Sequence, residues 1–372
     1  MIQKAPIHQN TKAAENGYAC PQAVHGGDVY RNEVKLDYSV SLNPLGVPEK
    51  IRSAALKGLD EITHYPDPYH IELRTVLAKA ENTDPEKIVC GSGASELIMA
   101  AVHAFMPHKA LITAPCYSGY ETALRASEAA ITEYPLSESD DFELGEGILD
   151  MISEDTDMVF ITDPNNPTGR LTDEELIVRI AEKCAACGAV LMIDECFRPL
   201  TGRGSSGLPH GKGSSDAAFG TVLHLRAFTK TFAIPGIRLG YIITDDISAA
   251  DKIRKHLPEW NISRIAERTG AAASELMTDS DYISRAAAEI ARERVYLTGE
   301  LESLGIRVYP GDANYLLIRT ESGLYEKLLA NGILIRRCAN FHGLDETYYR
   351  IAVRRHEDNV ILTDVLRRIY QE

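Results

Sequence analysis

Apolar runs of strand length alternate with helical stretches through the middle of the chain. Seven runs follow one another from residue 88 onward, and the segments between them repeat their apolar positions with helical spacing. The runs cover 88–90, 110–113, 130–134, 158–162, 190–193, 221–225 and 239–243. Continuously apolar strands that alternate with helices are typical of a mostly parallel sheet with helices on both faces. The pattern therefore predicts an α/β fold whose large domain holds a mostly parallel seven-stranded sheet.

The helix after the fourth run has clear signals at both ends. Thr172 is the predicted N-cap, and Glu175, three residues later, completes a capping box. Apolar residues at 176, 177 and 180 form one stripe, and Gly188 ends the helix.

The pattern changes past about residue 250. A long helix is expected over 281–304, with further helices over 324–331 and 358–370. Short strands are expected at 306–309, 315–318, 333–335 and 349–353. We therefore expect a small C-terminal α+β domain over 256–372 and a large domain over 61–255. Residues 1–60 are expected to form an N-terminal segment that packs with the small domain.

Composition narrows the class of protein. The 372 residues are 44% hydrophobic and 25% charged, which is ordinary for a globular chain with more than one core. The net charge of −15 argues against nucleic acid or an anionic membrane as a partner. No apolar run approaches the roughly 20 residues that span a bilayer, and the first residues lack the apolar core of a signal peptide. Seven scattered cysteines, an odd number, indicate a reducing cytosol, so a cytoplasmic location is predicted.

Groups suited to cofactor chemistry follow several of the predicted strands, and parallel strands present such groups at their C-terminal ends. The first run continues as GSGASE (91–96), which would open a helix with a cradle of free amides for a phosphate. It is not a dinucleotide motif, because Glu96 stands where the third glycine belongs. The fourth run continues as DPNNPTG (163–169), a rigid turn that carries amide side chains. No site for a metal ion is predicted.

The next strand ends carry charged residues. Asp194 ends a buried strand, where a carboxylate needs a partner, and a helix cap, an ion pair or a protonated pyridine nitrogen would each serve. Lys230 follows the sixth run, and Arg238 comes eight residues later. A lysine there can form a Schiff base with a carbonyl cofactor, and the arginine can clamp the cofactor's phosphate. Alternatively, Lys230 is a surface lysine before a Pro-Gly turn.

Together, the ordered series of glycine loop, Asn-Pro-Thr-Gly turn, aspartate, lysine and arginine resembles the fold type I pyridoxal-phosphate enzymes over nearly the whole chain. This resemblance implies that Lys230 forms the Schiff base, Asp194 meets the pyridine nitrogen and Asn166 meets the ring hydroxyl. Tyr117 would stack on the ring and, with Lys230 and Asp194, complete the catalytic set. The residues implied to hold the phosphate are Gly93, Ala94, Ser95, Thr229 and Arg238. Tyr65 would reach the phosphate of a neighbouring subunit, so a homodimer is implied.

Within this superfamily the chain is most similar to the histidinol-phosphate aminotransferase branch and, inside it, to the threonine-phosphate decarboxylases of cobalamin synthesis. The motifs that carry this similarity are HGGD (25–28), SVSLNPLG (39–46), YPGDANY (309–315), ILIRRCANFHGLD (333–345) and YYRIAVR (348–354). Three residues depart from the patterns of relatives. Asp28 stands where the decarboxylases usually carry asparagine, which is a mild mismatch. Phe197 removes a tyrosine that contacts the ring hydroxyl in many aminotransferases, as fits the decarboxylases. Ala227 removes a phosphate-binding hydroxyl and departs from both branches.

The resemblance implies a phosphorylated amino-acid substrate. Residues 336–355 contain five arginines and no lysine, which indicates either a small anionic ligand or a solvated charged face. Arg350 is the predicted carboxylate binder, with Arg354 on the same strand face as a second. Candidates for the substrate phosphate are Arg336, His25 and Asn43.

The main functional expectation is decarboxylation of O-phospho-L-threonine to (R)-1-aminopropan-2-ol phosphate. The alternatives are transamination of histidinol phosphate with 2-oxoglutarate, decarboxylation of phosphoserine to ethanolamine phosphate, and a non-catalytic binding module that kept the fold.

Overall fold

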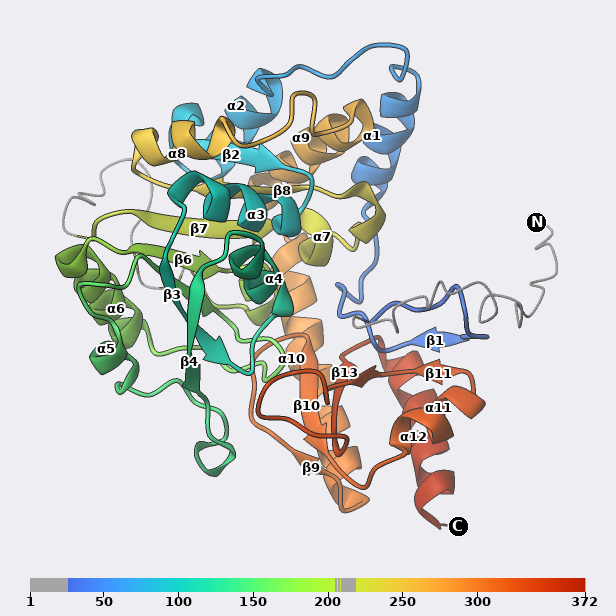
Figure 1. Ribbon diagram of the computed structural model, residues 1–372. Coiled ribbons are helices and arrows are strands. Elements are labelled where there is room, and N and C mark those ends of the chain that lie inside the picture. The colour runs from blue at the N-terminus through green and yellow to red at the C-terminus, as the bar shows by residue number, and fades with distance from the viewer. Residues whose placement is uncertain (1–25, 205, 207, 209–218, 372) are drawn as a thin grey trace, which may run out of the picture.

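A seven-stranded sheet forms the centre of the larger part of the computed structural model, which describes residues 26–204, 206, 208 and 219–371 (Figure 1). Its strands run in the order β2-β8-β7-β6-β5-β3-β4, and only β8 is antiparallel to its neighbours. They are β2 (Ile88–Gly91), β3 (Lys109–Ala114), β4 (Ala130–Pro135), β5 (Met158–Thr162), β6 (Val190–Asp194), β7 (Val222–Ala227) and β8 (Gly240–Ile243). The predicted mostly parallel sheet is therefore confirmed, and each of its strands overlaps one of the seven apolar runs.

Helices cover both faces of this sheet because its strands are apolar on both sides. On one face, α3 (Ala94–Phe105), α4 (Ser118–Ala126) and α8 (Ile247–Arg254) share a core cluster with sheet residues such as Ile112 and Phe160. On the other face, α5 (Ile148–Met151) and α6 (Glu174–Cys187) pack against alternate residues of the same strands.

The N-terminus of α6 differs from the prediction by one residue. The N-cap is Asp173, whose side chain accepts from the Leu176 amide at 3.0 Å. The Thr172 amide instead donates to the buried Asp163 carboxylate at 2.7 Å, which holds Thr172 in the turn before the helix. The capping-box assignment of Thr172 and Glu175 was therefore wrong. The predicted stop at Gly188, at φ 74°, is confirmed.

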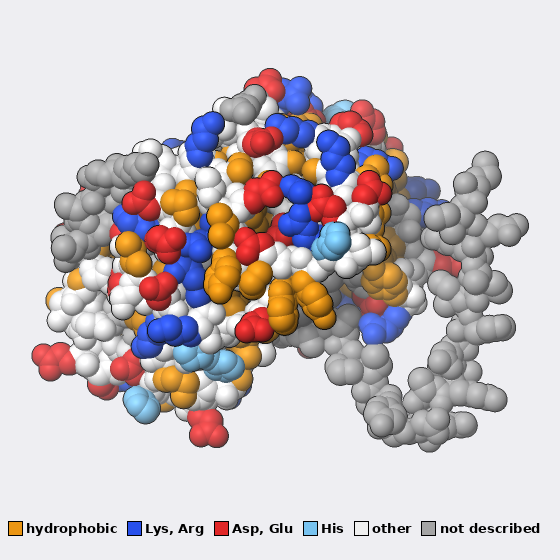
Figure 2. Space-filling model, turned by 90° about the horizontal axis from the view of Figure 1, so that it is seen from above, with side chains coloured by type: hydrophobic (Ala, Val, Ile, Leu, Met, Phe, Trp, Pro, Cys, Tyr) orange, Lys and Arg blue, Asp and Glu red, His pale blue; other side chains and the backbone are white. Residues whose placement is uncertain are grey.

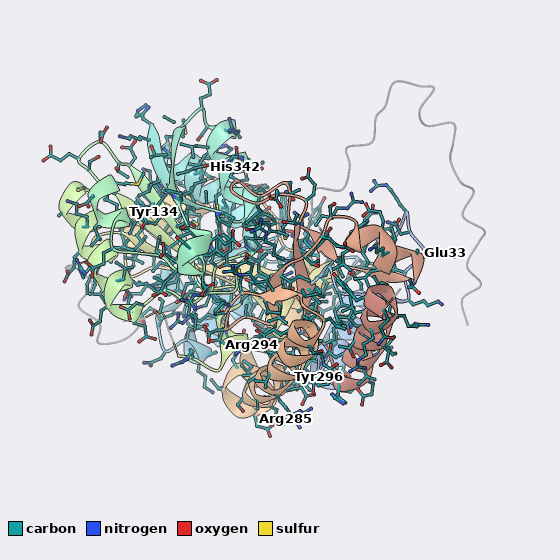
Figure 3. All side chains as sticks on the ribbon, turned by 90° about the horizontal axis from the view of Figure 1, so that it is seen from below. Glu33, Tyr134, Arg285, Arg294, Tyr296 and His342 are labelled. Atoms are coloured by element: carbon teal, nitrogen blue, oxygen red, sulfur yellow. The ribbon has the colours of Figure 1, made fainter. Side chains whose placement is uncertain are left out.

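The C-terminal region contains a second, antiparallel sheet in the order β12-β13-β10-β9. Its strands are β9 (Arg307–Val308), β10 (Tyr315–Arg319), β12 (Arg336–Arg337) and β13 (Tyr348–Ala352), and β1 (Leu36–Asp37) pairs separately with β11 (Ile333–Leu334). The accompanying helices are α10 (Tyr282–Ser303), α11 (Leu324–Ala330) and α12 (His356–Gln371). Arg294 of α10, labelled in Figure 3, donates to the carbonyls of Asp312 and Ala313 at 2.5 and 3.2 Å.

The N-terminal segment contacts both parts of the molecule. While β1 pairs with β11, α1 (Glu49–Leu59) packs against α9 (Arg264–Asp279), and α2 (Ile71–Ala80) joins them in one core cluster. At Gly58 a side chain would come within 2.7 Å of the Ile265 backbone, so this helix pair requires glycine there. The predicted domain bounds at 60/61 and 255/256 stay a prediction.

The face formed by α1, α2, α8 and α9 exposes hydrophobic side chains among charged ones (Figure 2). The large exposed hydrophobic residues of α1, α2 and the segments beside them are Leu56, Leu59, Ile62, Tyr65, Tyr69, Ile71 and Trp260. Within the described ranges, no helix is both long and apolar enough to cross a membrane.

Replacing Asp173 by alanine should destabilise the protein by about 1 kcal/mol, because the Leu176 amide loses its partner. Thermal denaturation followed by circular dichroism should show a lower Tm. Asp173→Ser retains an acceptor oxygen and should remain close to wild type. Equal Tm values for Asp173→Ala and wild type would contradict this assignment of the cap.

Candidate active site

Lys230 lies in α7 (Phe228–Thr231), immediately after β7, at the C-terminal edge of the sheet. Burial, followed by the positive charges of Arg350 and Arg238, lowers the pKa of its amine to about 8. The Phe197 ring centroid lies 5.4 Å from Nζ. The unprotonated amine, which is the form that attacks a carbonyl group, is therefore far more abundant near neutral pH than in an ordinary lysine and predominates above about pH 8.

Asp194 ends the neighbouring strand β6 and is buried. Its Oδ1 accepts from the Cys196 amide at 3.0 Å, and its Oδ2 accepts from the Tyr120 hydroxyl at 2.7 Å. Burial raises the pKa of the carboxyl group, and these two hydrogen bonds oppose the rise. The Tyr120 oxygen also lies 2.9 Å from Thr162 Oγ1, so the carboxylate is held from two sides.

Tyr120 was missed from the sequence, although a signal existed. It stands three residues after Tyr117, and residues at that spacing share a helix face. The rings of Tyr117 and Tyr120 meet edge-on at 5.5 Å, and the Tyr117 hydroxyl lies 3.3 Å from Ser95 Oγ. One helix start therefore places the predicted ring-stacking tyrosine next to both Ser95 and the partner of Asp194.

The predicted anion cradle lies at the N-terminus of α3. Its N-cap is Gly93, at φ 83°, and no side chain caps the helix. A Cβ atom on Gly93 would lie 2.7 Å from a terminal nitrogen of Arg238, so the guanidinium stands directly at this helix end. Helix N-terminal amides and a guanidinium that converge on one point make a site suited to a phosphate group. Thr229 is buried one residue before Lys230, in the segment that the phosphate would also touch.

Asn166 lies in the turn after β5, which the C-terminal region holds in place. Arg350 of β13 donates to Asn166 Oδ1 and, at 3.0 Å, to the Ser39 carbonyl. Tyr315 donates to the Asn165 carbonyl at 2.7 Å, and the Asp312 amide donates to the Gly169 carbonyl at 2.7 Å. Two sequence regions about 150 residues apart therefore meet at the side chain predicted to bind the ring hydroxyl.

Arg336 and Arg350 face each other as cross-strand partners in β12 and β13. Both are buried, and burial lowers both pKa values, that of Arg336 to about 10. The Arg336 side chain donates to Asn340 Oδ1 at 2.7 Å, and its guanidinium lies 5.1 Å from the Phe341 ring. Arg350 Nε has no hydrogen-bond partner among the described residues.

Neither arginine of this pair contacts a carboxylate within the ranges that the structure describes. By contrast, the buried residues Arg74 and Arg198 do form ion pairs. Two adjacent buried cations without acids require anions from elsewhere.

The other predicted substrate contacts have different surroundings. Asn43 donates from its side chain to the Thr231 carbonyl at 2.8 Å, and its own amide donates to the Lys230 carbonyl at 3.1 Å. Arg354 donates to Asp358 at 2.9 Å and to the Asp37 carbonyl at 3.0 Å. His25 lies outside the described residues. The substrate roles of these three residues stay predictions.

Three further residues bear on the predicted departures and contacts. Phe197 packs edge-on against Tyr315 at 5.0 Å and offers no hydroxyl to the site. Tyr65 is 79% exposed and lies 4.8 Å, centroid to centroid, from Trp260. Ala227 is buried at the end of β7.

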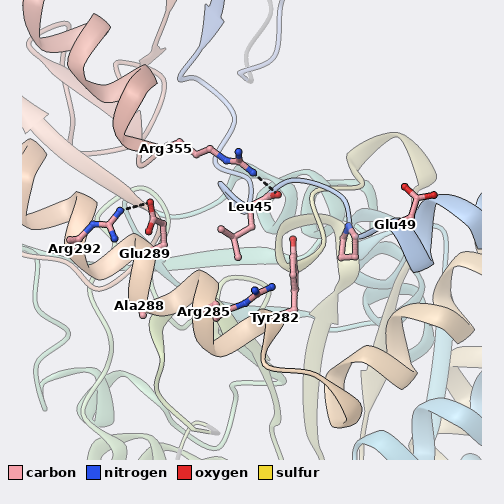
Figure 4. A pocket seen from close by; sticks show the side chains of 9 residues that line it. Leu45, Glu49, Tyr282, Arg285, Ala288, Glu289, Arg292 and Arg355 are labelled. Carbon is pink, nitrogen blue, oxygen red and sulfur yellow. Dashed lines mark hydrogen bonds and ion pairs between the residues drawn. The ribbon is translucent and has the colours of Figure 1, made fainter.

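A groove of about 900 Å³ lies apart from these groups, between residues 45–49 and α10 (Figure 4). Its arginines are engaged: Arg355 donates to the carbonyls of Pro44 and Leu45, and Arg292 pairs with Glu289 at 2.7 Å. Arg355 therefore binds the backbone at Pro44. The preceding residue, Asn43, contacts the Lys230 carbonyl through its amide.

The donor set fits pyridoxal phosphate. A desolvated amine after β7, a buried carboxylate at the end of β6 and helix amides after β2 lie at strand ends of one sheet, and these are the groups that the ring and the phosphate require. No cluster of three or more metal-ligating side chains occurs in the described part of the chain. Fold and site together define a fold type I pyridoxal-phosphate enzyme.

Comparison with known proteins identifies the family. The model of the aminotransferase class I and II family matches residues 33–366, and the chain belongs to this family. Threonine-phosphate decarboxylase of Salmonella typhimurium is 34% identical over 90% of this chain and 91% of its own length. Histidinol-phosphate aminotransferase of Methanosphaera stadtmanae is 28% identical over 88% and 89%. The crystal structure of histidinol-phosphate aminotransferase from Clostridium acetobutylicum superposes with a TM-score of 0.80 at 32% identity, covering 90% of this chain and 99% of its own.

In the apoprotein, the rate at which Lys230 reacts with an acylating reagent should rise with pH through a midpoint near 8. The folded-state pKa is below the usual lysine value, so the reactive amine forms at lower pH. Arg350→Gln removes a positive charge beside the amine and should move the midpoint upward, while Arg337→Gln, on the next strand, should not. Mass spectrometry of the Lys230 peptide over a pH series measures this. A wild-type midpoint above 10 would contradict the assignment.

Proposed function

We propose that the enzyme decarboxylates O-phospho-L-threonine to (R)-1-aminopropan-2-ol phosphate, in the synthesis of cobalamin. The observation that carries this proposal is the cross-strand pair of Arg336 and Arg350, buried and without carboxylate partners among the described residues. A substrate with both a carboxylate and a phosphate would supply the two missing anions. The similarity to a threonine-phosphate decarboxylase over most of both chains supports the same substrate class.

Pyridoxal phosphate supplies an electron sink, which accepts the electron pair of whichever Cα bond stands perpendicular to its ring. Asp194, held by Tyr120 and the Cys196 amide, is the group that would keep the pyridine nitrogen protonated. Arg350 would hold the substrate carboxylate by a bidentate fork and so select the Cα–carboxylate bond. Lys230 Nζ would hold the proton that replaces the departing carbon dioxide at Cα.

A second candidate reaction is transamination of histidinol phosphate with 2-oxoglutarate. It is favoured by the similarity to histidinol-phosphate aminotransferases, one of them at 32% identity. A phosphoserine decarboxylase would use the same site, because the two phospho-amino acids differ by one methyl group. The binding free energies of two substrates that differ by one methyl group differ by only about 1–3 kcal/mol in such a pocket.

The reactions are separated by incubating the holoenzyme with phosphothreonine, phosphoserine, or histidinol phosphate plus 2-oxoglutarate. Carbon dioxide, the amine product and glutamate are quantified together. We expect stoichiometric carbon dioxide and aminopropanol phosphate from phosphothreonine. Efficient glutamate formation without carbon dioxide would overturn the decarboxylase proposal and favour the aminotransferase.

Arg336→Ala should weaken apparent binding of phosphothreonine by about tenfold or more, since a charge-assisted hydrogen bond to the phosphate is lost. Binding of unphosphorylated threonine should change much less. Arg337→Ala is the matched control, because Arg337 is half exposed and pairs with Glu326 on the surface. Steady-state KM and kcat on both substrates decide the point. Equal losses on threonine and phosphothreonine would remove Arg336 from the phosphate site.

We also infer a homodimer in which Tyr65 reaches the cofactor phosphate of the partner subunit. Tyr65 and Trp260 are 79% and 45% exposed and lie against each other at the surface, as an interface would require. Replacing both Ile62 and Tyr69 by glutamate should therefore yield monomers by analytical ultracentrifugation, with a loss of activity. A fully active wild-type monomer would rule out a site shared between subunits.

A cytoplasmic location is part of this proposal. The six cysteines in the described ranges are all free, as a reducing compartment would allow.

A further inference from the structure

A carboxylate stands beside the cradle that the cofactor's phosphate would occupy. Glu96 belongs to the first turn of α3, and its Oε2 accepts from the Ser92 amide at 2.6 Å. The same oxygen accepts from Asn261 Nδ2 at 2.7 Å. Because the N-terminus of a helix attracts any anion, an unrestrained Glu96 side chain would compete with the phosphate for the free amides of α3.

The orientation of the Asn261 amide follows from its neighbours. A carboxylate only accepts hydrogen bonds, so the NH₂ group of Asn261 must face Glu96. Its Oδ1 then faces His70 Nε2 at 3.0 Å. On its other side, the buried His70 ring lies 2.8 Å from the Glu267 carboxylate, which is also paired with Arg264 at 2.8 Å. Asn261 is therefore held by His70, the N-cap residue of α2, which Glu267 of α9 holds in turn.

The backbone conformation of the residue before Asn261 is unusual, and Asn261 contacts Glu96 from it. Trp260 has φ 54°, in the left-handed region that bulky residues seldom adopt, and its ring lies against Tyr65 at the surface. In this conformation two consecutive side chains have different partners: Trp260 contacts Tyr65, and Asn261 contacts Glu96.

We propose that Asn261 is a positioning residue that holds the Glu96 carboxylate on the Ser92 amide and so keeps the first amides of α3 for the cofactor's phosphate. The inference rests on the assignment of that helix end to the phosphate. It predicts a loss of affinity that depends on the phosphate group and that disappears when Glu96 loses its charge.

The test compares two probes on the full-length apoprotein. Dissociation constants for pyridoxal phosphate and for pyridoxal, which lacks the phosphate, are measured by absorbance titration. The pyridoxal constant divided by the pyridoxal-phosphate constant gives the contribution of the phosphate. Asn261→Leu should reduce this ratio by about tenfold, as expected when a hydrogen bond to a charged group is lost. Asn261→Asp, which repels Glu96, should reduce it at least as far. Asn331→Leu, at the exposed end of α11, is the matched control and should match wild type.

The double variant Asn261→Leu with Glu96→Gln should recover the wild-type ratio, because no competing charge remains. A purely structural role of Asn261 would weaken both probes alike and would not be rescued by Glu96→Gln; either result overturns the proposal. Arg238→Ala tests the underlying assignment separately. If Arg238→Ala lowers the ratio but both Asn261 variants leave it unchanged, only the role of Asn261 is wrong. If Arg238→Ala also leaves it unchanged, the phosphate site lies elsewhere.

Discussion

The lowered pKa of the Lys230 amine is the central physical constraint at this site. Desolvation and the charges of Arg350 and Arg238 all disfavour the ammonium form, so the amine is neutral at a pH where an exposed lysine is charged. The same arrangement leaves Arg336, Arg350 and Arg238 without carboxylate partners among the described residues, in a chain whose net charge is −15. Under the proposed function, the cofactor phosphate would bind Arg238, which is exposed at the N-terminus of α3, and the substrate's two anionic groups would bind the buried pair Arg336 and Arg350.

The fold holds these charges in place by joining distant segments at one sheet edge. The strand order brings Asp194 and the lysine strand side by side, with Asp194 paired to Leu225 of β7. The turn at 163–169 is bound by Tyr315 and Arg350 from the C-terminal region, and the backbone at Lys230 is bound by Asn43 from the N-terminal region. Three parts of the chain thus share the positioning of the groups around Lys230. A change in the packing between them would alter the lysine's surroundings without touching the lysine itself.

Much of this was predictable from local signals, and the exceptions have a common cause. Most sheet strands are predominantly apolar runs, so the sheet and the strand ends bearing Asp194 and Lys230 could be located from the sequence, although β4 contains Glu133 and β7 contains Arg226. Asp173 displaced Thr172 as the N-cap because the Asp163 carboxylate binds the Thr172 amide, a contact that the capping pattern does not contain. Tyr120 binds Asp194, 74 positions away, and Asn261 binds Glu96, 165 positions away. No pattern near either residue in the sequence indicates these partners.

The most direct test of the account is to locate the cofactor on the chain. Borohydride reduction of the holoenzyme fixes pyridoxal phosphate to the amine that carries it, and peptide mapping by mass spectrometry then identifies the residue. The account predicts the added mass on the peptide that contains Lys230, and none on Lys230→Ala treated in the same way. Attachment at another lysine, or an unmodified Lys230 in an active holoenzyme, would contradict it.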